Sequence, residues 1–280
     1  QHFSAADKDP LFHSDFLLNI FIDRSGCIWI CTGDGVYCCR ELKDLYTEHV
    51  KIEPNTNREW SNYVRHISNI GNDKLAVSTR ANRTYIYDTR TQQRTLERQT
   101  DACVYDYAID PQGKKWISTK GDGIYIDNVR YSKYKKEHYA PGAAFYKTIF
   151  DKQGRAWIAT WGEGLLITPQ TMGQQPRKFE QFLNADGKEA QIHDLLLDRK
   201  GRLWVCSNNG ILMVNTAEKK ITAQKFLRFS DENGKLPVSE INCGIEAHDG
   251  KLWFAATGGV LKCSYDEKTR ELEYELFDTS

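Results

Sequence analysis

The chain has 280 residues, 40% of them hydrophobic, and its 38 basic and 38 acidic side chains give a formal net charge of zero. This apolar content is sufficient for a packed core, whereas a neutral chain lacks the positive field that nucleic acids and anionic membranes require of their partners. No run of about 18 apolar residues occurs, so we expect no contact of this segment with nucleic acid or membrane.

The N-terminus shows no sign of a leader. The chain starts at Gln1 without an initiator methionine, and no basic segment followed by an apolar one comes after it. We therefore expect a mature or truncated piece of a longer protein.

One phrase recurs along the chain: Asp-x-x-Gly-x-x-Trp, then a hydrophobic residue, any residue, and Thr or Ser. The positions aligned on its glycine fall at 26, 72, 113, 154, 201 and 250, a spacing of 41 to 49 residues. This period is typical of one propeller blade. In chain order the phrases occupy residues 23–32, 69–78, 110–119, 151–160, 198–207 and 247–256.

Each repeat predicts four strands. The apolar run before each Asp predicts an inner strand, and Asp-x-x-Gly predicts a tight hairpin turn because Asp binds nearby amides and Gly accepts positive φ. The Trp-containing strand, a second glycine-rich or Asn-rich turn and a third strand follow, and a charged segment of variable length completes the blade. The sequence therefore predicts an all-β fold, a β-propeller of about six four-stranded blades, or seven if the chain ends build part of another. We expect residues 1–280 to form a single domain.

The second repeat departs from the phrase. It has Asn69, Asn72 and Leu75 where the others have Asp, Gly and Trp. We expect the repeated tryptophans to pack between neighbouring blades, burying on the order of 200 Å² each, and Leu75 to take that place in the second blade. Trp60 and Trp161 lie outside the phrase.

The cysteines and histidines do not predict a metal or catalytic site. None of the eight cysteines forms a C-x2-C pair, so zinc is not expected; buried free thiols and one structural disulfide both stay open. The seven histidines lack the H-x-x-x-H and H-E-x-x-H spacings, and nucleophile-elbow and phosphate-loop motifs are absent. We predict no catalytic residues, no metal and no cofactor.

The phrase D-x-x-G-x-x-W-I-x-T-x-x-G-hydrophobic resembles the two-component-regulator propeller repeat of Bacteroides-type hybrid two-component system proteins. The resemblance extends from about Phe16 to Phe277. It implies the periplasmic sensor portion of an inner-membrane receptor, which detects glycan fragments and signals through a histidine kinase outside this chain. It also implies a neighbouring propeller or sandwich domain as a partner, and a homodimer stays open. Two alternatives stay open as well: a propeller lyase or hydrolase of the streptogramin-lyase-like type, and a scaffold that only packs on a partner domain.

In a propeller, ligand-binding groups gather where the loops between second and third strands meet the starts of the first strands. Asn, Asp, Arg and exposed aromatic side chains suit a sugar or other small ligand, and suit a protein interface almost as well. The predicted ligand-binding residues, all from the loops between second and third strands, are Arg80, Asn82, Arg83, Lys120, Trp161, Glu163, Asn208 and Asn209. The segments leading into the first strands add His13, Asp15, Tyr63, Arg65, Tyr105, Asp106, Phe145, Tyr146, His193, Asp194, Glu240 and Asn242. We expect Arg80 and Trp161 to lie on the same face and to contact the ligand or partner together.

Overall fold

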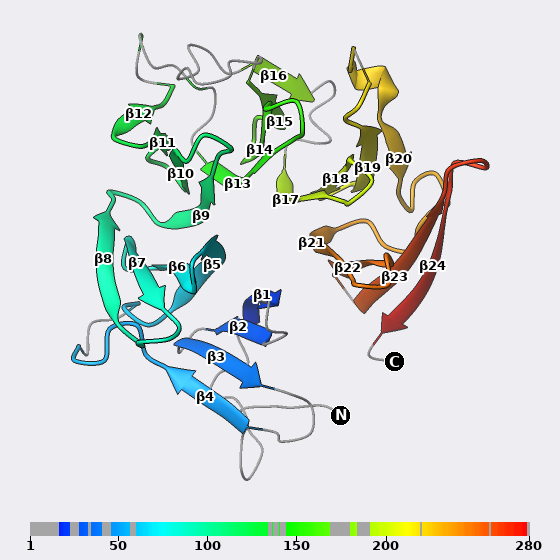
Figure 1. Ribbon diagram of the computed structural model, residues 1–280. Helices are drawn as coiled ribbons and strands as arrows, with labels where there is room; N and C mark the ends of the chain where they lie inside the picture. The colour runs from blue at the N-terminus through cyan, green and yellow to red at the C-terminus, as the bar shows by residue number, and fades with distance from the viewer. Residues whose placement is uncertain are drawn as a thin grey trace. The chain divides into compact units, whose positions relative to one another are not determined.

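A computed structural model describes residues 17–22, 28–32, 35–40, 46–56, 60–133, 136, 140, 144–168, 180–183, 191–218, 220–257 and 259–278. Among these residues the regular structure is strand, apart from one short 3-10 helix at Ala223–Lys225 (Figure 1). No helix in the described part of the chain has the length and apolarity needed to cross a bilayer.

The strands follow one another as the repeats predict. They are β1 (Leu17–Ile22), β2 (Ile28–Thr32), β3 (Gly35–Arg40), β4 (Tyr46–Val50), β5 (Val64–Gly71), β6 (Lys74–Thr79), β7 (Arg83–Asp88), β8 (Arg94–Gln99), β9 (Val104–Ile109), β10 (Lys115–Thr119), β11 (Ile124–Ile126), β12 (Val129–Tyr131), β13 (Ala144–Phe150), β14 (Ala156–Trp161), β15 (Leu165–Ile167), β16 (Glu180–Leu183), β17 (Ile192–Leu197), β18 (Arg202–Ser207), β19 (Gly210–Asn215), β20 (Leu227–Phe229), β21 (Ile241–Glu246), β22 (Leu252–Ala256), β23 (Gly259–Asp266) and β24 (Glu271–Asp278).

These strands form four-stranded antiparallel sheets. Their orders are β1-β2-β3-β4, β5-β6-β7-β8, β12-β11-β10-β9, β13-β14-β15-β16, β17-β18-β19-β20 and β21-β22-β23-β24. Each sheet is a meander of consecutive strands, as expected for a blade. The prediction of an all-β fold built from four-stranded sheets is confirmed, and the number of blades in a closed propeller stays a prediction.

The chain divides into two compact units, which we describe separately. The first comprises residues 1–109 and 115–122, and the second residues 110–114 and 123–280. The first therefore contains β1 to β10, and the second β11 to β24. The expectation of one domain over residues 1–280 stays a prediction.

The turn of the phrase is organised by its aspartate. In the fourth repeat, Asp151 Oδ1 accepts hydrogen bonds from the backbone amides of Gln153 and Arg155, each at 3.0 Å. Asp151 Oδ2 accepts from Arg155 Nε at 2.6 Å and from Trp157 Nε1 at 2.8 Å. Gly154 has a φ of 77°, the left-handed conformation that glycine adopts without steric cost. The Asp151 carboxylate therefore holds the turn, the Arg155 guanidinium and the buried Trp157 indole in place through hydrogen bonds.

The fifth repeat reproduces this arrangement. Asp198 Oδ1 accepts from the Arg202 amide at 2.9 Å, and Asp198 Oδ2 accepts from Arg202 Nε at 2.5 Å and Trp204 Nε1 at 2.9 Å. Both arginines also reach the following sheet of the second unit: Arg155 donates to the Thr216 carbonyl at 2.6 Å, and Arg202 pairs with Glu267 at 3.5 Å. The Asp and Gly of the first repeat lie outside the described residues.

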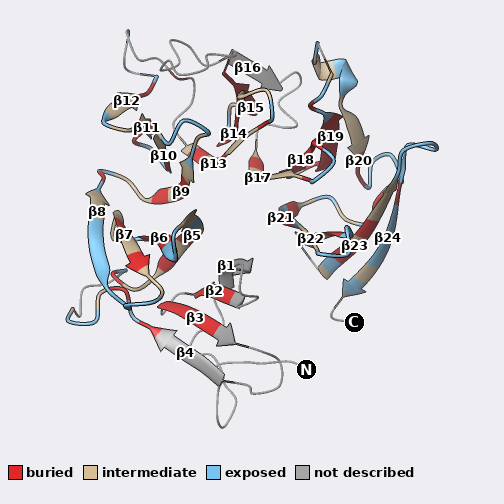
Figure 2. Ribbon diagram, viewed as in Figure 1, coloured by how far each residue is buried: buried red, intermediate tan, exposed pale blue. Residues whose placement is uncertain are grey.

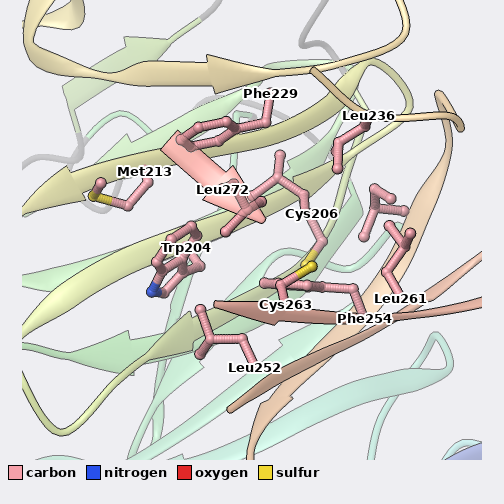
Figure 3. Packing of buried hydrophobic residues seen from close by; sticks show 12 residues of the cluster. Trp204, Cys206, Met213, Phe229, Leu236, Leu252, Phe254, Leu261, Cys263 and Leu272 are labelled. Carbon is pink, nitrogen blue, oxygen red and sulfur yellow. The ribbon is translucent and has the colours of Figure 1, made fainter. Parts of the chain in front are cut away.

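The repeated tryptophans pack between sheets. In the second unit Trp204 is 0% exposed and belongs to one core cluster with Phe229 of its own sheet and Leu252, Phe254 and Leu261 of the next (Figure 3). Its ring centroid lies 6.0 Å from that of Phe254. The packing role predicted for these tryptophans is confirmed here.

In the first unit, Trp29 of β2 packs in one cluster with Leu75 and Tyr87 of the next sheet. Leu75 is only 2% exposed and pairs with Asn69, as Lys115 pairs with Ile109 in the next sheet, whereas Ala76 pairs with Ser68 in the register where Trp116 pairs with Ala108. Ala76 therefore occupies the position of the repeat tryptophan, and the prediction that Leu75 takes it is wrong: the second repeat is shifted by one residue relative to the phrase, so Leu75 faces the preceding sheet and packs against its Trp29. Trp253, in contrast, is only half-buried and stacks on Phe277 at 5.8 Å.

Burial decreases from the second and third strands to the fourth in the sheets whose fourth strand has described side chains. The second and third strands carry most of the buried residues, as β18 and β19 show, whereas β8 is largely exposed (Figure 2). This gradient agrees with the prediction that charged segments supply the outer strands.

Each first strand has an irregularity that the repeats did not predict. The register with the second strand shifts at the second or third residue of the first strand in all of these sheets, between Leu17 and Asn19, Val64 and His66, Val104 and Asp106, Phe145 and Lys147, Ile192 and Asp194, and Ile241 and Cys243. Such a β-bulge leaves one residue unpaired and re-aims its side chain. The residues inside the shifts are Leu18, Arg65, Tyr105, Tyr146, His193 and Asn242.

The cysteines of the described part are thiols. Cys31, Cys38, Cys206 and Cys263 are buried, and Cys103 and Cys243 are partly buried; all six are free. For these six, buried free thiols are confirmed over a disulfide. Cys27 and the side chain of Cys39 lie outside the described residues.

Candidate ligand site

The two kinds of loop predicted to form the site meet within individual sheets. In the first unit the Arg80 amide donates to the Tyr63 carbonyl and the Lys120 amide to the Cys103 carbonyl, each at 2.9 Å. Each bond joins the residue after a second strand to the residue before a first strand. The loop after β6 and the loop after β10 are therefore held beside the bulges of β5 and β9.

The second unit repeats this contact. The Asn208 amide donates to the Gln191 carbonyl at 3.1 Å, and the Thr257 amide to the Glu240 carbonyl at 3.0 Å. Trp161, at the equivalent position of its own sheet, pairs with Ala144. Arg80, Lys120, Trp161 and Asn208 therefore occupy one structural position in four different sheets.

The first unit gathers cations and aromatic rings at this end of its sheets. The Arg80 guanidinium carbon lies 4.4 Å from the Trp60 ring centroid and 4.9 Å from that of Tyr63. Those two rings meet edge to face at 5.5 Å. The Arg65 guanidinium carbon lies 4.3 Å from the centroid of Tyr105. These are cation–π distances, because each charge lies within about 6 Å of a ring.

Lys120 extends this group across the next sheet. Its Nζ lies 5.8 Å from the same Tyr105 ring that Arg65 contacts. The thiol between these elements reports on all three cations: burial raises the pKa of Cys103, and the charges of Arg65, Arg80 and Lys120 oppose that rise. The three positive charges therefore lie within electrostatic range of one thiol, near the start of β9.

Asn82 and Arg83 are placed differently from Arg80. Arg83 Nη1 donates to Glu53 Oε2 at 2.9 Å and its Nε to Gln99 Oε1 at 2.8 Å. Asn82 has a φ of 62°, and its side-chain Nδ2 donates to the Asp101 carbonyl at 3.3 Å. Arg83 therefore neutralises a carboxylate, and Asn82 shapes the turn.

In the second unit, Trp161 lies in an aromatic stack. Its ring centroid is 5.6 Å from Tyr146 at an interplanar angle of 24°, and 5.3 Å from His193 at 16°. Tyr146 and His193 are the bulge residues of two successive first strands. Trp161 keeps 41% of its surface exposed, so protein rings stack on an indole that still meets solvent.

The other predicted residues of the second unit serve mainly the turns. The Glu163 amide donates to Thr160 Oγ1 at 3.2 Å. The Asn209 amide donates to Ser207 Oγ at 3.1 Å, its carbonyl accepts from Arg228 Nη1 at 3.1 Å, and the residue is buried. Asn208 is half-buried beside it.

An acidic residue comes directly after the bulge residue in two of the first strands. In the first unit Asp106 lies 3.3 Å from His66 Nε2, and both are buried. In the second unit Asp194 Oδ2 accepts the Gly244 amide at 3.1 Å. Burial raises the pKa of the Asp194 carboxyl, while the charge of Lys147 acts to lower it.

Sequence reasoning missed the bulges and the place of Cys103 among the cations. The bulge residues were predicted to lie in loops, but they lie inside first strands. No local signal marks them, because the shift depends on the pairing with the second strand and the residues themselves range from Leu18 and Tyr105 to Arg65. His13, Asp15 and Asp34 lie outside the described residues. Within the described ranges, no three His, Cys, Asp or Glu side chains form a metal-binding group.

A hollow of about 510 Å³ lies elsewhere, beside the β23–β24 hairpin. Lys200, Asp266, Glu267, Lys268 and Glu273 line it with charges of both signs. Lys200 belongs to the Asp-x-x-Gly turn, so this hollow is at the opposite end of its sheets from the candidate site.

Comparison with known proteins supports the repeat. Residues 186–209 match the family described as two-component regulator propeller. This segment includes the whole fifth repeat phrase, residues 198–207, so the chain contains a repeat of this kind. A search of curated proteins found no match to the sequence.

The fold resembles solved structures of different activities. One is the extracellular domain of the putative hybrid two-component system BT3049 from B. thetaiotaomicron, with a TM-score of 0.71, 16% identity, and coverage of 95% of this chain and 35% of that one. Another is virginiamycin B lyase from Staphylococcus aureus, with a TM-score of 0.67, 13% identity, and coverage of 95% and 85%. A third is PorZ of Porphyromonas gingivalis, with a TM-score of 0.61, 14% identity, and coverage of 94% and 42%. At these identities the resemblance concerns the fold, and the chain spans about a third of the extracellular domain of BT3049.

Proposed function

We propose that this chain is a non-catalytic ligand-sensing propeller of a hybrid two-component receptor and that it binds an oligosaccharide. Its six sheets would close as the blades of a single domain. The portion would lie in the periplasm as part of an inner-membrane protein, beside a neighbouring propeller or sandwich domain of the same receptor. The propeller repeat at residues 186–209 and the fold shared with an extracellular sensor domain support this assignment.

One observation supports ligand binding in particular. From the second sheet to the sixth, the bulge of the first strand places the side chain of one unpaired residue at the end of the sheet where the loop after the second strand lies. In successive sheets these side chains are Arg65, Tyr105, Tyr146, His193 and Asn242. Aromatic faces pack on the C–H groups of sugars, and Arg and Asn donate to their hydroxyl groups. A repeated bulge is a device for presenting side chains next to a site.

A thermal-shift screen against oligosaccharide libraries, followed by calorimetry on the hits, tests the proposal. Arg80→Ala and Trp161→Ala should each weaken binding by about 1–3 kcal/mol, as for a lost charged hydrogen bond or ring contact, while the melting temperature barely moves. Arg90→Ala is the control, because its exposed side chain pairs only weakly with Asp73 at 3.7 Å. A chain that binds no saccharide in the screen contradicts the proposal.

The alternative is a lyase, which the similarity to virginiamycin B lyase over 85% of that chain supports. The two functions differ in turnover. Incubation of the purified protein with a cyclic depsipeptide lactone and mass spectrometry of the product distinguishes them: a new linear product of unchanged mass would favour the lyase.

A further inference from the structure

Three cations of the first unit form no ion pair with any described residue. Arg65, Arg80 and Lys120 contact aromatic rings, and among the described residues no carboxylate lies within ion-pair distance of any of them. Elsewhere in the same unit arginine is neutralised, as Arg83 is by Glu53. A cation–π contact is worth about 0.5–1 kcal/mol at an exposed site and uses the ring-facing side of a guanidinium, not its N–H donors. The donors of Arg65 and Arg80 are therefore available to a ligand.

The acidic residues nearest in sequence are engaged elsewhere. Asp106 follows Tyr105 but pairs with His66. Asp122 follows Lys120 by two residues, and its Oδ2 accepts the Asp101 amide at 3.3 Å. Neither carboxylate forms an ion pair with Arg65, Arg80 or Lys120, so an anion placed at the start of β9 would be attracted by all three cations.

The aromatic rings form the second half of the group. Trp60 is 42% exposed and has a φ of 69°, a conformation that a bulky side chain rarely adopts. Residues held in such conformations concentrate at binding sites. The ring presents an exposed apolar surface next to the Arg80 guanidinium, so an apolar surface and a planar donor fork lie side by side.

We propose that Trp60, Tyr63, Arg65, Arg80, Tyr105 and Lys120 form a subsite for the anionic group of an acidic saccharide, a uronate carboxylate or a sulfate ester. Rings contact the sugar face, and the three cations bind the acid group by charge-assisted hydrogen bonds. This inference rests on the proposed function and specifies the class of sugar. A neutral sugar would leave the cations without an acceptor, so the subsite discriminates by charge.

Calorimetry with tetragalacturonate, its full methyl ester and a sulfated disaccharide tests the inference. We expect the uronate or the sulfated sugar to bind at least about tenfold more tightly than the ester, and the difference to shrink as salt is raised. Arg80→Gln, Arg65→Gln and Lys120→Gln should each reduce that preference by about tenfold, and Arg80→Lys should retain part of it. Preference for the uronate assigns the carboxylate, and preference for the sulfated sugar assigns the ester.

Arg94→Gln is the matched control, because it removes one positive charge and one cation–π contact, at 5.7 Å from Tyr87, outside the group. It should leave the preference unchanged. Of the three variants, Lys120→Gln is the one we expect to disturb the fold least. Lys120 is exposed, and among the described residues its side chain makes only the ring contact at 5.8 Å.

The outcomes separate the two proposals. Equal binding of uronate and ester, unaffected by the three variants, overturns the acidic subsite and leaves the oligosaccharide sensor in place. Binding of inorganic sulfate that depends on the three cations, with no saccharide bound at all, supports the anion site and contradicts the sensor. If neither sulfate nor any saccharide binds, both proposals are wrong.

Discussion

Trp157→Ala tests how the repeated phrase stabilises the fold. Trp157 is 0% exposed, packs with Leu203 and Val205 of the next sheet, and donates its Nε1 hydrogen to Asp151 at 2.8 Å. The substitution therefore removes an entire side chain from between two sheets and one donor from a buried carboxylate. Neither loss can be repaired by solvent in a core without exposed atoms.

The magnitude follows from these contacts. Replacing a core Trp by Ala costs about 3–5 kcal/mol, and the lost hydrogen bond adds about 1 kcal/mol, because Arg155 and two amides still bind the carboxylate. A destabilisation of 1 kcal/mol lowers the melting temperature by about 2–4 °C in a domain of roughly this size. We expect a fall of about 10 °C or more.

Differential scanning calorimetry of the variant and wild type measures this fall. Trp157→Phe keeps an aromatic ring but no donor and should lose about 1–3 kcal/mol. Trp161→Ala is the control, since 41% of that side chain is already exposed, and its loss should be small. If Trp157→Ala melts within about 2 °C of wild type, the packing role of the repeat tryptophan is refuted.

Two further changes have defined outcomes. Gly210→Ala should destabilise strongly, because a Cβ there would lie 2.2 Å from the Phe229 carbonyl oxygen, whereas Gly250→Ala, with a similar φ of 81° and nothing within 4 Å, should cost about 1 kcal/mol; urea unfolding of both measures the difference, and equal losses would contradict the clash. Burial raises the pKa of Asp194, so its stabilising contribution is present below the unfolded pKa and lost as pH rises through the folded one. Asp194→Asn should therefore raise the unfolding free energy at about pH 8 but not at about pH 4, and an unchanged difference between the two pH values would contradict this assignment.

The repeated phrase was sufficient to predict the strands because its residues act locally. Asp151, Gly154 and Trp157 lie within seven residues and organise one turn and one core position through contacts among themselves. Where those residues are lost, as in the second repeat, the phrase alone misplaced the core position by one residue, because Ala76 and not Leu75 stands in the register of the tryptophan.

The site was harder to predict because its contacts join residues distant in sequence. Arg80 and Arg83 look alike in the sequence, but Arg83 pairs with Glu53, some thirty positions earlier, and no acidic side chain of the described ranges pairs with Arg80. The bulge residues depend on the register between two strands, and nothing in Val64–Gly71 itself specifies where that register shifts. Whether Arg80 and Trp161 contact one ligand stays a prediction.

The link that Arg155 makes to the Thr216 carbonyl, and Arg202 to Glu267, has an evolutionary consequence. Each arginine reaches the residues just after the third strand of the following sheet, so the joint between two repeats is encoded half in each of them. A repeat that is duplicated or lost as a unit brings both halves with it, and the new neighbours find the same joint. A single substitution in one phrase, in contrast, removes the contact between only one pair of neighbouring sheets. Genes built in this way can vary in repeat number while individual repeats drift in sequence, as the second repeat has done.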